Sequence, residues 1–258
     1  MGRNPRAKIG QKPGRLGQFA LWFKPSWRMT FDEYANFYHG LNPKSREKLR
    51  RLSEAGKDEG KRFRYMARKY GKIYSSEDNI IDHRALVEGV SRLNLPKGAT
   101  VASYGAGNLH HECFLAKEFP NIGKIIGVEP LREMAKQVPR VALNILGPRG
   151  RKKVSVVPGT FEESPLKEKS VDLIISNESF HHVKDAEKAL GHMFSRLKPG
   201  GGIVIVYRPE YRTRPPKPAE IAALMERFGA KAVESRAVRT DSKEPNNNIH
   251  LIVGRNGR

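Results

Sequence analysis

The sequence predicts an α/β fold in which helices wrap a mostly parallel sheet of seven strands, preceded by a basic helical extension. From residue 99 onward, short apolar runs rich in valine and isoleucine alternate with amphipathic stretches. This alternation is typical of a parallel sheet that carries helices on both faces. The last two apolar runs follow one another without an intervening helix, so we expect them to pair antiparallel.

The expected elements follow from these runs in chain order. The strands are "ATVASYG", "KIIGVEP", "KVSVVPG", "VDLIISN", "GGIVIVYRP", "AKAVESRAV" and "NIHLIVGR". The helices lie near 108–119, 131–145, 185–197 and 217–228, and a further helix at about 77–93 leads into the first strand. In a sheet of this kind ligands bind at the carboxyl ends of the strands, so the loops after the strands hold the candidate site.

The formal net charge of +21 is the strongest compositional feature. A charge of this size indicates a polyanionic partner, and nucleic acid is the commonest one. An anionic membrane is the competing partner, but no basic amphipathic helix with a large apolar face is recognisable. No apolar run approaches the ~18 residues of a membrane span. With no recognisable DNA-reading module, we expect RNA as the partner and no membrane association.

The first third of the chain carries more than half of this charge. Residues 1–29 contain seven Lys and Arg and no acid, and repeated Gly and Pro interrupt any regular element. Over residues 1–74, 19 Lys and Arg stand against 6 Asp and Glu. We therefore expect a flexible basic arm at 1–29, a helical RNA-binding extension at 30–97 and the domain that contains the sheet at 98–258.

Cysteine content and the amino terminus bear on the compartment. Cys113 is the only cysteine, which excludes internal disulfides and favours a reducing compartment. It lies in the apolar run "CFLA" and is expected to be a small core residue. The amino terminus lacks the apolar stretch of a signal peptide. We expect a cytoplasmic monomer without a metal site, since no His, Asp or Glu set has zinc spacing.

Two glycines and an acid mark the candidate ligand site. In "VASYGAGN", Gly105 and Gly107 allow a tight turn and the close approach of a ligand to the backbone. Glu129 ends the second strand run, 22 residues beyond Gly107, where a carboxylate can accept both hydroxyls of a ribose. A site for NAD uses the same logic, so these residues alone leave the cofactor open.

Two further segments, "GTFEESPLKEKSVDLIISNESFHHV" and "LKPGGGIVIV", complete a pattern that resembles the class I S-adenosylmethionine-dependent methyltransferases over about 98–256. The resemblance implies a Rossmann-like fold and S-adenosyl-L-methionine as cofactor. It places Ser103, Gly105 and Gly107 at the methionine part, Glu129 at the ribose, Thr160 and Phe161 at the adenine, and Asn177 at the catalytic face. The chain departs from the family pattern where Ser103 replaces an acid, Leu109 a third glycine and Thr160 a frequent Asp.

The loop "NESF" at 177–180 suggests the substrate. Enzymes that methylate exocyclic base amines carry Asp/Asn/Ser-Pro-Pro-Tyr/Phe here, and this chain has the first and last members without the prolines. In such enzymes an oxygen like that of Asn177 accepts the amine N–H and an aromatic ring like that of Phe180 holds the base. Many small-molecule methyltransferases carry a Ser-Asn-x-x-x-His-His loop instead, which 176–182 also fits. The net charge favours the base.

These features predict an RNA methyltransferase with Asn177 and Phe180 as catalytic residues and ribosomal RNA or a ribosomal subunit as partner. The expected target is an exocyclic amine, with cytidine N4 ahead of adenosine N6. Two alternatives remain: a methyltransferase of small metabolites, and a non-catalytic RNA-binding factor of ribosome assembly on a decayed methyltransferase fold. The second alternative is motivated by Ser103.

Overall fold

A computed structural model of the chain describes residues 76–208, 216–238 and 249–257. The chain divides into two compact units, Met1–Ile81 and Asp82–Arg258, and the second unit contains the whole sheet. The basic arm expected at 1–29 and most of the helical extension expected at 30–97 lie outside the described residues. Residues 82–97, which the sequence assigned to that extension, belong to the unit that contains the sheet.

In the described part of the chain, seven strands form a single sheet in the order β3-β2-β1-β4-β5-β7-β6. The strands are β1 (Ala99–Tyr104), β2 (Ile122–Val128), β3 (Val154–Val157), β4 (Val171–Asn177), β5 (Leu197–Tyr207), β6 (Ala230–Val238) and β7 (Ile249–Asn256). The first five pair in parallel, and β7 runs antiparallel to both β5 and β6. This confirms the expected Rossmann-like sheet, including its antiparallel last pair.

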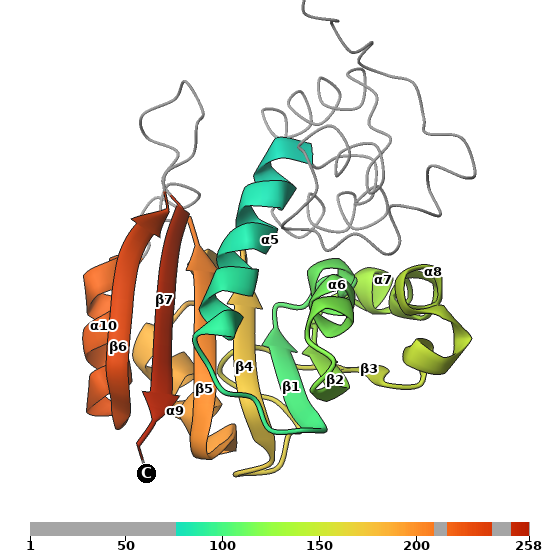
Figure 1. Ribbon diagram of the computed structural model, residues 1–258. Helices are drawn as coiled ribbons and strands as arrows, with labels where there is room; N and C mark the ends of the chain where they lie inside the picture. Colours follow the sequence, from blue (N-terminus) through green and yellow to red (C-terminus); the bar gives the residue numbers. More distant parts are fainter. Residues whose placement is uncertain (1–75, 209–215, 239–248, 258) are drawn as a thin grey trace, which may run out of the picture. The chain divides into compact units, whose positions relative to one another are not determined.

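Helices cover both faces of the sheet (Figure 1). They are α5 (Ser76–Ser91), α6 (His110–Glu118), α7 (Arg132–Ala135), α8 (Val138–Arg151), α9 (Ala186–Arg196) and α10 (Pro218–Arg227), with a 3-10 turn η2 at Phe180–His182. The single helix expected at 131–145 is two helices. Pro139 lies in the first turn of α8, where proline is tolerated, and it could not continue a helix from α7.

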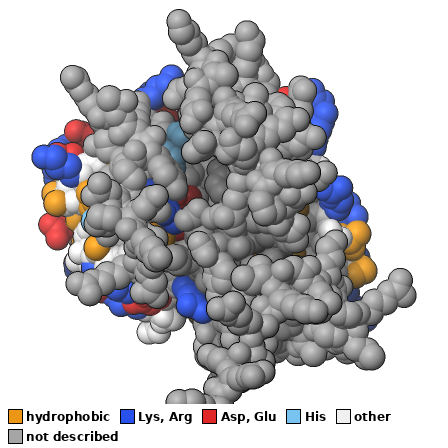
Figure 2. Space-filling model, turned by 90° about the horizontal axis from the view of Figure 1, so that it is seen from above, with side chains coloured by type: hydrophobic (Ala, Val, Ile, Leu, Met, Phe, Trp, Pro, Cys, Tyr) orange, Lys and Arg blue, Asp and Glu red, His pale blue; other side chains and the backbone are white. Residues whose placement is uncertain are grey.

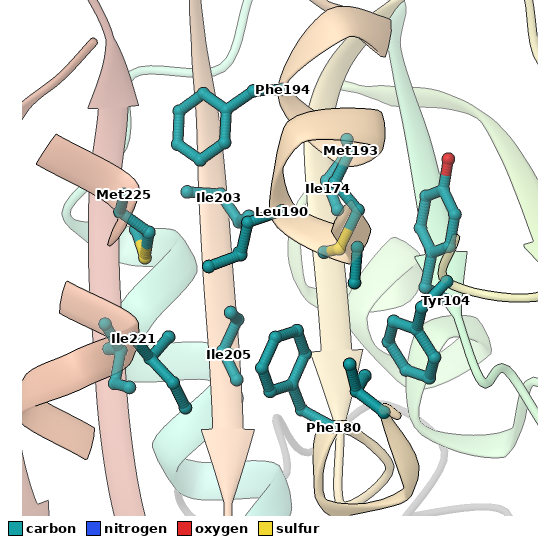
Figure 3. Packing of buried hydrophobic residues seen from close by; sticks show 14 of the residues in the cluster. Tyr104, Ile174, Phe180, Leu190, Met193, Phe194, Ile203, Ile205, Ile221 and Met225 are labelled. Atoms are coloured by element: carbon teal, nitrogen blue, oxygen red, sulfur yellow. The ribbon is translucent and has the colours of Figure 1, made fainter. Parts of the chain in front are cut away.

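A hydrophobic core cluster lies between the sheet and helices α9 and α10 (Figure 3). The apolar face expected along 185–197 is part of it, with Leu190 and Met193 fully buried. Asp185 caps α9 by accepting the Lys188 N–H at 3.0 Å, which satisfies one of the free amides at the start of the helix. Ile203 and Ile205 of the interior strand β5 face these helices and are fully buried.

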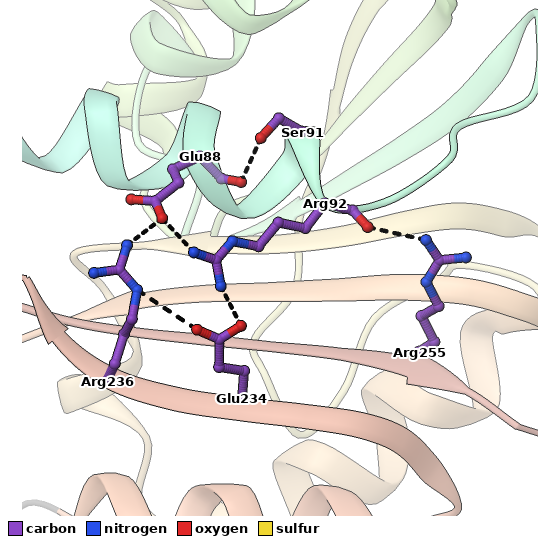
Figure 4. A network of polar contacts seen from close by, with 6 residues as sticks. All are labelled: Glu88, Ser91, Arg92, Glu234, Arg236 and Arg255. Atoms are coloured by element: carbon purple, nitrogen blue, oxygen red, sulfur yellow. Dashed lines mark hydrogen bonds and ion pairs between the residues drawn. The ribbon is translucent and has the colours of Figure 1, made fainter.

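A network of charged side chains joins α5 to the antiparallel edge of the sheet (Figure 4). Arg92 pairs with Glu88 one turn earlier and with Glu234 of β6, and Arg236 pairs with the same two carboxylates. Arg255 of β7 donates to the Arg92 carbonyl at 2.9 Å. Each pair is partly exposed and contributes little alone, so the network mainly fixes the position of α5 on the sheet.

Gly89 allows α5 to lie close to the sheet. An added Cβ would lie 2.6 Å from Val204 Cγ1 and 3.0 Å from Leu251 Cδ1. Overpacking of this kind costs ~1–3 kcal/mol, which exceeds the gain of up to ~1 kcal/mol in helix propensity. We expect Gly89→Ala to lower the free energy of unfolding, measured by chemical denaturation, by about 1 kcal/mol. Asn144→Ala, at an exposed position of α8, should leave it unchanged or slightly raised.

Candidate cofactor and substrate site

Three loops that sequence analysis singled out lie side by side at the carboxyl edge of the sheet. Strand β1 is paired with β2 on one side and β4 on the other, so the loops that follow these strands are neighbours. The loop after β1 contains Gly105 and Gly107, Glu129 follows β2, and Asn177 ends β4. The sheet order therefore brings the predicted methionine, ribose and substrate positions together.

Glu129 connects two of these loops. Its side chain is 6% exposed, and its two carboxylate oxygens accept the backbone N–H of Gly107 at 2.7 Å and of Leu131 at 2.8 Å. Burial raises the pKa of Glu129, and the bonds from Leu131 and Gly107 oppose that rise. Each carboxylate oxygen keeps further lone pairs for a ligand hydroxyl. The arrangement fixes the carboxylate where a ribose hydroxyl pair is expected.

Ser179 explains why residue 105 is a glycine. Gly105 has φ +64°, and an added Cβ would lie 2.5 Å from the Ser179 Cβ. The Ser179 hydroxyl donates to the Tyr104 carbonyl at 3.0 Å and lies 3.0 Å from the Ser176 hydroxyl. The glycine loop and the substrate loop are thus in direct contact. Sequence reasoning missed Ser179, because nothing local indicates that its partner lies 75 residues earlier.

A carboxyl group lies beneath the glycine loop although the strand carries Ser103 in the position usual for an acid. The Ser103 hydroxyl donates to Glu112 Oε1 of α6 at 2.7 Å, and both side chains are buried. Burial raises the pKa of Glu112 to about 7, and the bond from Ser103 opposes the rise. Glu112 of helix α6 thus places a carboxyl group beside Ser103, where the family usually has an acid on the strand. The sequence motif alone does not show this contact, because the two residues belong to different elements.

Leu109, which stands where the family has a third glycine, keeps the backbone that glycine would adopt. Its φ and ψ are 60° and 30°, a left-handed conformation that costs ~1–2 kcal/mol for a residue with a Cβ. The side chain is fully buried, and its methyl groups lie near the Cα of Gly127 on β2. Burial of a leucine contributes ~1.5–3 kcal/mol, enough to offset the strain.

The predicted adenine-side residues follow β3. Thr160 is exposed, and its backbone N–H donates to the Glu163 carbonyl at 2.7 Å. Phe161 is 8% exposed and lies against Tyr104, with ring centroids 6.0 Å apart at an angle of 30°. Its Cζ would come within 3.2 Å of a Cβ added at Gly105, so the ring reaches the glycine loop.

Asn177 ends β4 with an amide oxygen that is buried and has no hydrogen-bond partner among the described residues. The residue pairs with Val206 of β5 in the parallel register, which fixes its backbone. A buried acceptor without a donor is costly, ~1–3 kcal/mol, and such groups in native proteins mark positions where a ligand or water donates. A ligand or water N–H or O–H donor at this oxygen would satisfy it.

Phe180 does not lie where a base could stack on it. It is fully buried in the core cluster, with its ring edge-on to Phe161 at 5.5 Å and to Tyr207 at 6.4 Å (Figure 3). The sequence motif suggested an aromatic platform, but η2 turns this side chain inward beneath the loop. The ring therefore supports the loop from within, and the aromatic half of the amine-methyltransferase pattern has no exposed counterpart in Phe180.

Arg208, at the end of β5, holds the substrate loop. Its guanidinium is fully buried and pairs with Glu178 at 3.0 Å and with Asp82 of α5 at 2.9 Å. Glu178 has φ +51°, an unfavourable backbone for a residue with a Cβ. The ion pair and the bond from the Glu178 N–H to the Val206 carbonyl hold that conformation. Sequence reasoning missed both Arg208 and Asp82, which lie 126 residues apart.

The two histidines of the substrate loop and the cysteine differ in their exposure to solvent. His181 is buried and His182 exposed, with ring centroids 4.1 Å apart. Cys113 is fully buried, and burial raises the pKa of its thiol.

Among the described residues, His, Cys, Asp and Glu side chains form no group of three that could hold a metal ion. In the same ranges no helix is long and apolar enough to cross a membrane.

The family described as "Methyltransferase domain" matches residues 103–205, which include the glycine loop, Glu129 and Asn177 but not Asp82 or Arg208. An uncharacterized methyltransferase of Geobacillus sp. (strain WCH70) is 36% identical over 110 residues, covering 42% of this chain and 46% of the relative. A second, from Geobacillus kaustophilus, is 33% identical over the same length. The chain thus spans about half the length of the curated relatives it matches.

Solved structures show the same fold. A chain of the complex between the Haloferax volcanii Trm112 methyltransferase activator and a methyltransferase has a TM-score of 0.59 at 17% identity, covering 76% of this chain and 98% of that one. A SAM-dependent methyltransferase from Aquifex aeolicus has a TM-score of 0.50 at 23% identity, covering 66% and 88%. The fold is that of the S-adenosylmethionine-dependent methyltransferases. The buried Glu129 carboxylate has the chemistry expected for a group that accepts ribose hydroxyls.

Glu129 provides a test of the cofactor assignment. Two charge-assisted hydrogen bonds to ribose hydroxyls are worth ~1.5–3 kcal/mol each. We therefore expect Glu129→Ala to weaken S-adenosylmethionine binding, measured by calorimetry, by at least about tenfold. Glu133→Ala, which removes a carboxylate four residues later, should bind the cofactor as the unmodified protein does. Equal affinity of both variants would contradict the role of Glu129.

Glu112 provides a test by pH. Because its pKa is about 7 in the folded state against a usual value of 4.5, the folded protein holds an extra proton between these values. The stability contributed by protonated Glu112 is therefore lost as pH rises from about 4.5 to 7, by up to about 3 kcal/mol at ~1.4 kcal/mol per unit.

We expect Glu112→Gln to stabilise the protein more at pH 8 than at pH 5. Subtracting the two unfolding profiles removes the contribution of all other titrating groups. A difference between variant and unmodified protein that does not change with pH would contradict the elevated pKa.

Proposed function

We propose that the protein is an S-adenosylmethionine-dependent methyltransferase that modifies a base of structured RNA at an exocyclic amine, with ribosomal RNA as the expected substrate. The observation that carries the proposal is the buried amide oxygen of Asn177, which has no donor among the described residues. It lies at the end of β4, beside the glycine loop and Glu129. Cytidine N4 is the first target to test and adenosine N6 the second.

In this proposal the residues at the carboxyl edge of the sheet have separate roles in binding the cofactor and in positioning the amine. Gly105 and Gly107 let the cofactor approach the backbone, and Glu129 accepts its ribose hydroxyls. S-adenosylmethionine would supply an electrophilic methyl group and leave as S-adenosylhomocysteine, so the protein needs to position the amine. The methylated nitrogen is acidic and can lose its proton to water, so no strong base is needed. An exocyclic amine is a poor nucleophile because its lone pair is delocalised into the ring. Asn177 Oδ1, by accepting one amine N–H, draws the nitrogen toward a tetrahedral geometry and aims its lone pair.

Charge supports RNA as the substrate class. The formal net charge is +21, and residues 1–74 hold 19 Lys and Arg against 6 acids. A metabolite-modifying enzyme has no need of such an excess, whereas RNA binding gains from each cation placed near a phosphate. The amino-terminal 29 residues, without a single acid, are proposed to run along the RNA.

The burial of Phe180 favours a second candidate, a methyltransferase of small molecules. Without an exposed ring at this position, the loop lacks the base platform of the amine methyltransferases, and "SNESFHH" fits the small-molecule pattern equally well. This candidate predicts methylation of a free metabolite at a rate independent of salt. Mass spectrometry of RNA nucleosides from cells with and without the gene separates the two, because only the first loses a modified nucleoside.

Asn177 is the residue on which the proposed chemistry depends. An oxygen that acts mainly in the transition state affects kcat more than KM. We expect Asn177→Ala to lower kcat for methylation of the RNA by about 10²-fold, by analogy with removal of a preorganised hydrogen-bonding group.

Asn177→Asp, which keeps an acceptor oxygen, should retain most of the activity. Phe180→Leu, which keeps an apolar side chain in the core, should lower stability and leave KM for the RNA unchanged. A large increase in KM for the RNA in a stably folded Phe180→Leu variant would indicate that the Phe180 ring contacts the substrate base after all.

Residues 1–29 are tested by deletion. If their seven cations contact phosphates, the deletion should weaken RNA binding and make the slope of log affinity against log salt shallower. The affinity for S-adenosylmethionine should not change. An unchanged salt slope would mean that the arm does not contact RNA.

A further inference from the structure

The flank formed by the start of β2, α7, α8 and the entry to β3 carries a concentration of exposed cations. They are Lys124, Arg132, Lys136, Arg140, Arg149, Arg151, Lys152 and Lys153, called here the basic flank. Across residues 124–153 the only acids are Glu129, which is buried in the cofactor site, and Glu133, which is half-buried. The flank therefore has a local charge that its own acids do not balance.

In the ranges that the structure describes, no carboxylate pairs with any of these eight cations, whereas Arg92, Arg196 and Arg227 each pair with a glutamate. Exposed lysines elsewhere in the same unit, such as Lys167 and Lys188, also have no carboxylate partner among the described residues. The flank is therefore distinguished by the density of cations on it, and a surface dense in one sign of charge favours an external anion.

Two of the lysines are placed next to each other by the sheet itself. Ile125 of β2 pairs with Val154 of β3, and the Ile125 N–H donates to the Lys153 carbonyl at 2.8 Å. Lys124 of β2 and Lys153 at the entry to β3 precede this pair, so the two residues are neighbours at the start of the parallel pair. The favourable interaction of Arg149 and Arg151 with the carboxyl end of α8 does not extend to these lysines.

The cations form two groups. Arg132, Lys136 and Arg140 lie between the start of α7 and the first turn of α8, and the remaining five lie where β2 begins and where the chain enters β3. Between Arg140 and the turn at Gly147, which has φ 72°, α8 rises about 10 Å. This rise equals about three phosphates of one strand of a duplex. Figure 2 shows blue side chains on the right-hand rim, the side where Figure 1 places α7 and α8.

We propose that the basic flank is a second RNA-binding surface, which holds the phosphate backbone of the substrate along α8 while the target base enters at the carboxyl edge. This inference rests on the proposed RNA methyltransferase function. An anionic membrane fits the flank less well, because Leu143 is the only exposed large apolar residue of the described ranges and an interfacial helix needs an apolar face.

The test uses the full chain and a fluorescent RNA hairpin at several salt concentrations. One variant combines Arg151→Gln, Lys152→Gln and Lys153→Gln, which lie far from the cofactor edge. A matched control combines Lys167→Gln, Lys169→Gln and Lys188→Gln, which removes the same charge from exposed positions near Glu168 and Glu187. S-adenosylmethionine affinity and thermal unfolding are measured for both to show that the folds and cofactor sites are intact.

We expect the flank variant to bind the hairpin at least about tenfold more weakly at low salt, with the salt slope reduced by about 2 to 3, since each lost phosphate contact removes ~0.7–0.9. The control should keep both values close to those of the unmodified protein. Equal losses in both variants, or none in either, would overturn the inference while leaving RNA binding itself in place. Failure of the unmodified protein to bind the hairpin, with or without binding to vesicles of anionic phospholipid, would overturn the proposed function as well.

Discussion

The buried guanidinium of Arg208 is the constraint on which the geometry of the substrate edge depends. It is enclosed at the end of β5 and joins Asp82 of α5 to Glu178 of the loop after β4. Removing one member of a buried ion pair costs ~3–5 kcal/mol, because a charge is left without a partner. The loop is therefore held in a single conformation, including the unfavourable φ of Glu178, and Asn177 takes its position from that loop.

The same edge is fixed a second time through uncharged contacts. Ser179 bonds to the Tyr104 carbonyl and occupies the space that a side chain at residue 105 would need. Phe180 then anchors the loop in the core between Phe161 and Tyr207. Ser179 contacts the glycine loop and lies two residues after Asn177. A displacement of the glycine loop should therefore also displace Asn177.

Pattern and periodicity were sufficient to predict the sheet and the positions of Gly105, Gly107 and Glu129, because each depends on local chain properties. The split between α7 and α8 was missed, since an apolar period continues across it while Pro139 does not continue a helix. Phe180 was misjudged because a motif records residue type and not the direction of a side chain. Glu112, Ser179 and Arg208 were missed because their roles arise from partners that the fold brings from distant positions.

The distribution of charge separates the two binding tasks physically. At the cofactor edge, Glu129 and Glu112 are buried and bonded to backbone amides or a hydroxyl, so dissolved ions screen them little. On the basic flank the cations are exposed and unpaired with described carboxylates, so every interaction they make is screened within about 10 Å at ordinary ionic strength. Cofactor affinity should consequently be nearly independent of salt, whereas the proposed binding of RNA should weaken steeply as the salt concentration rises.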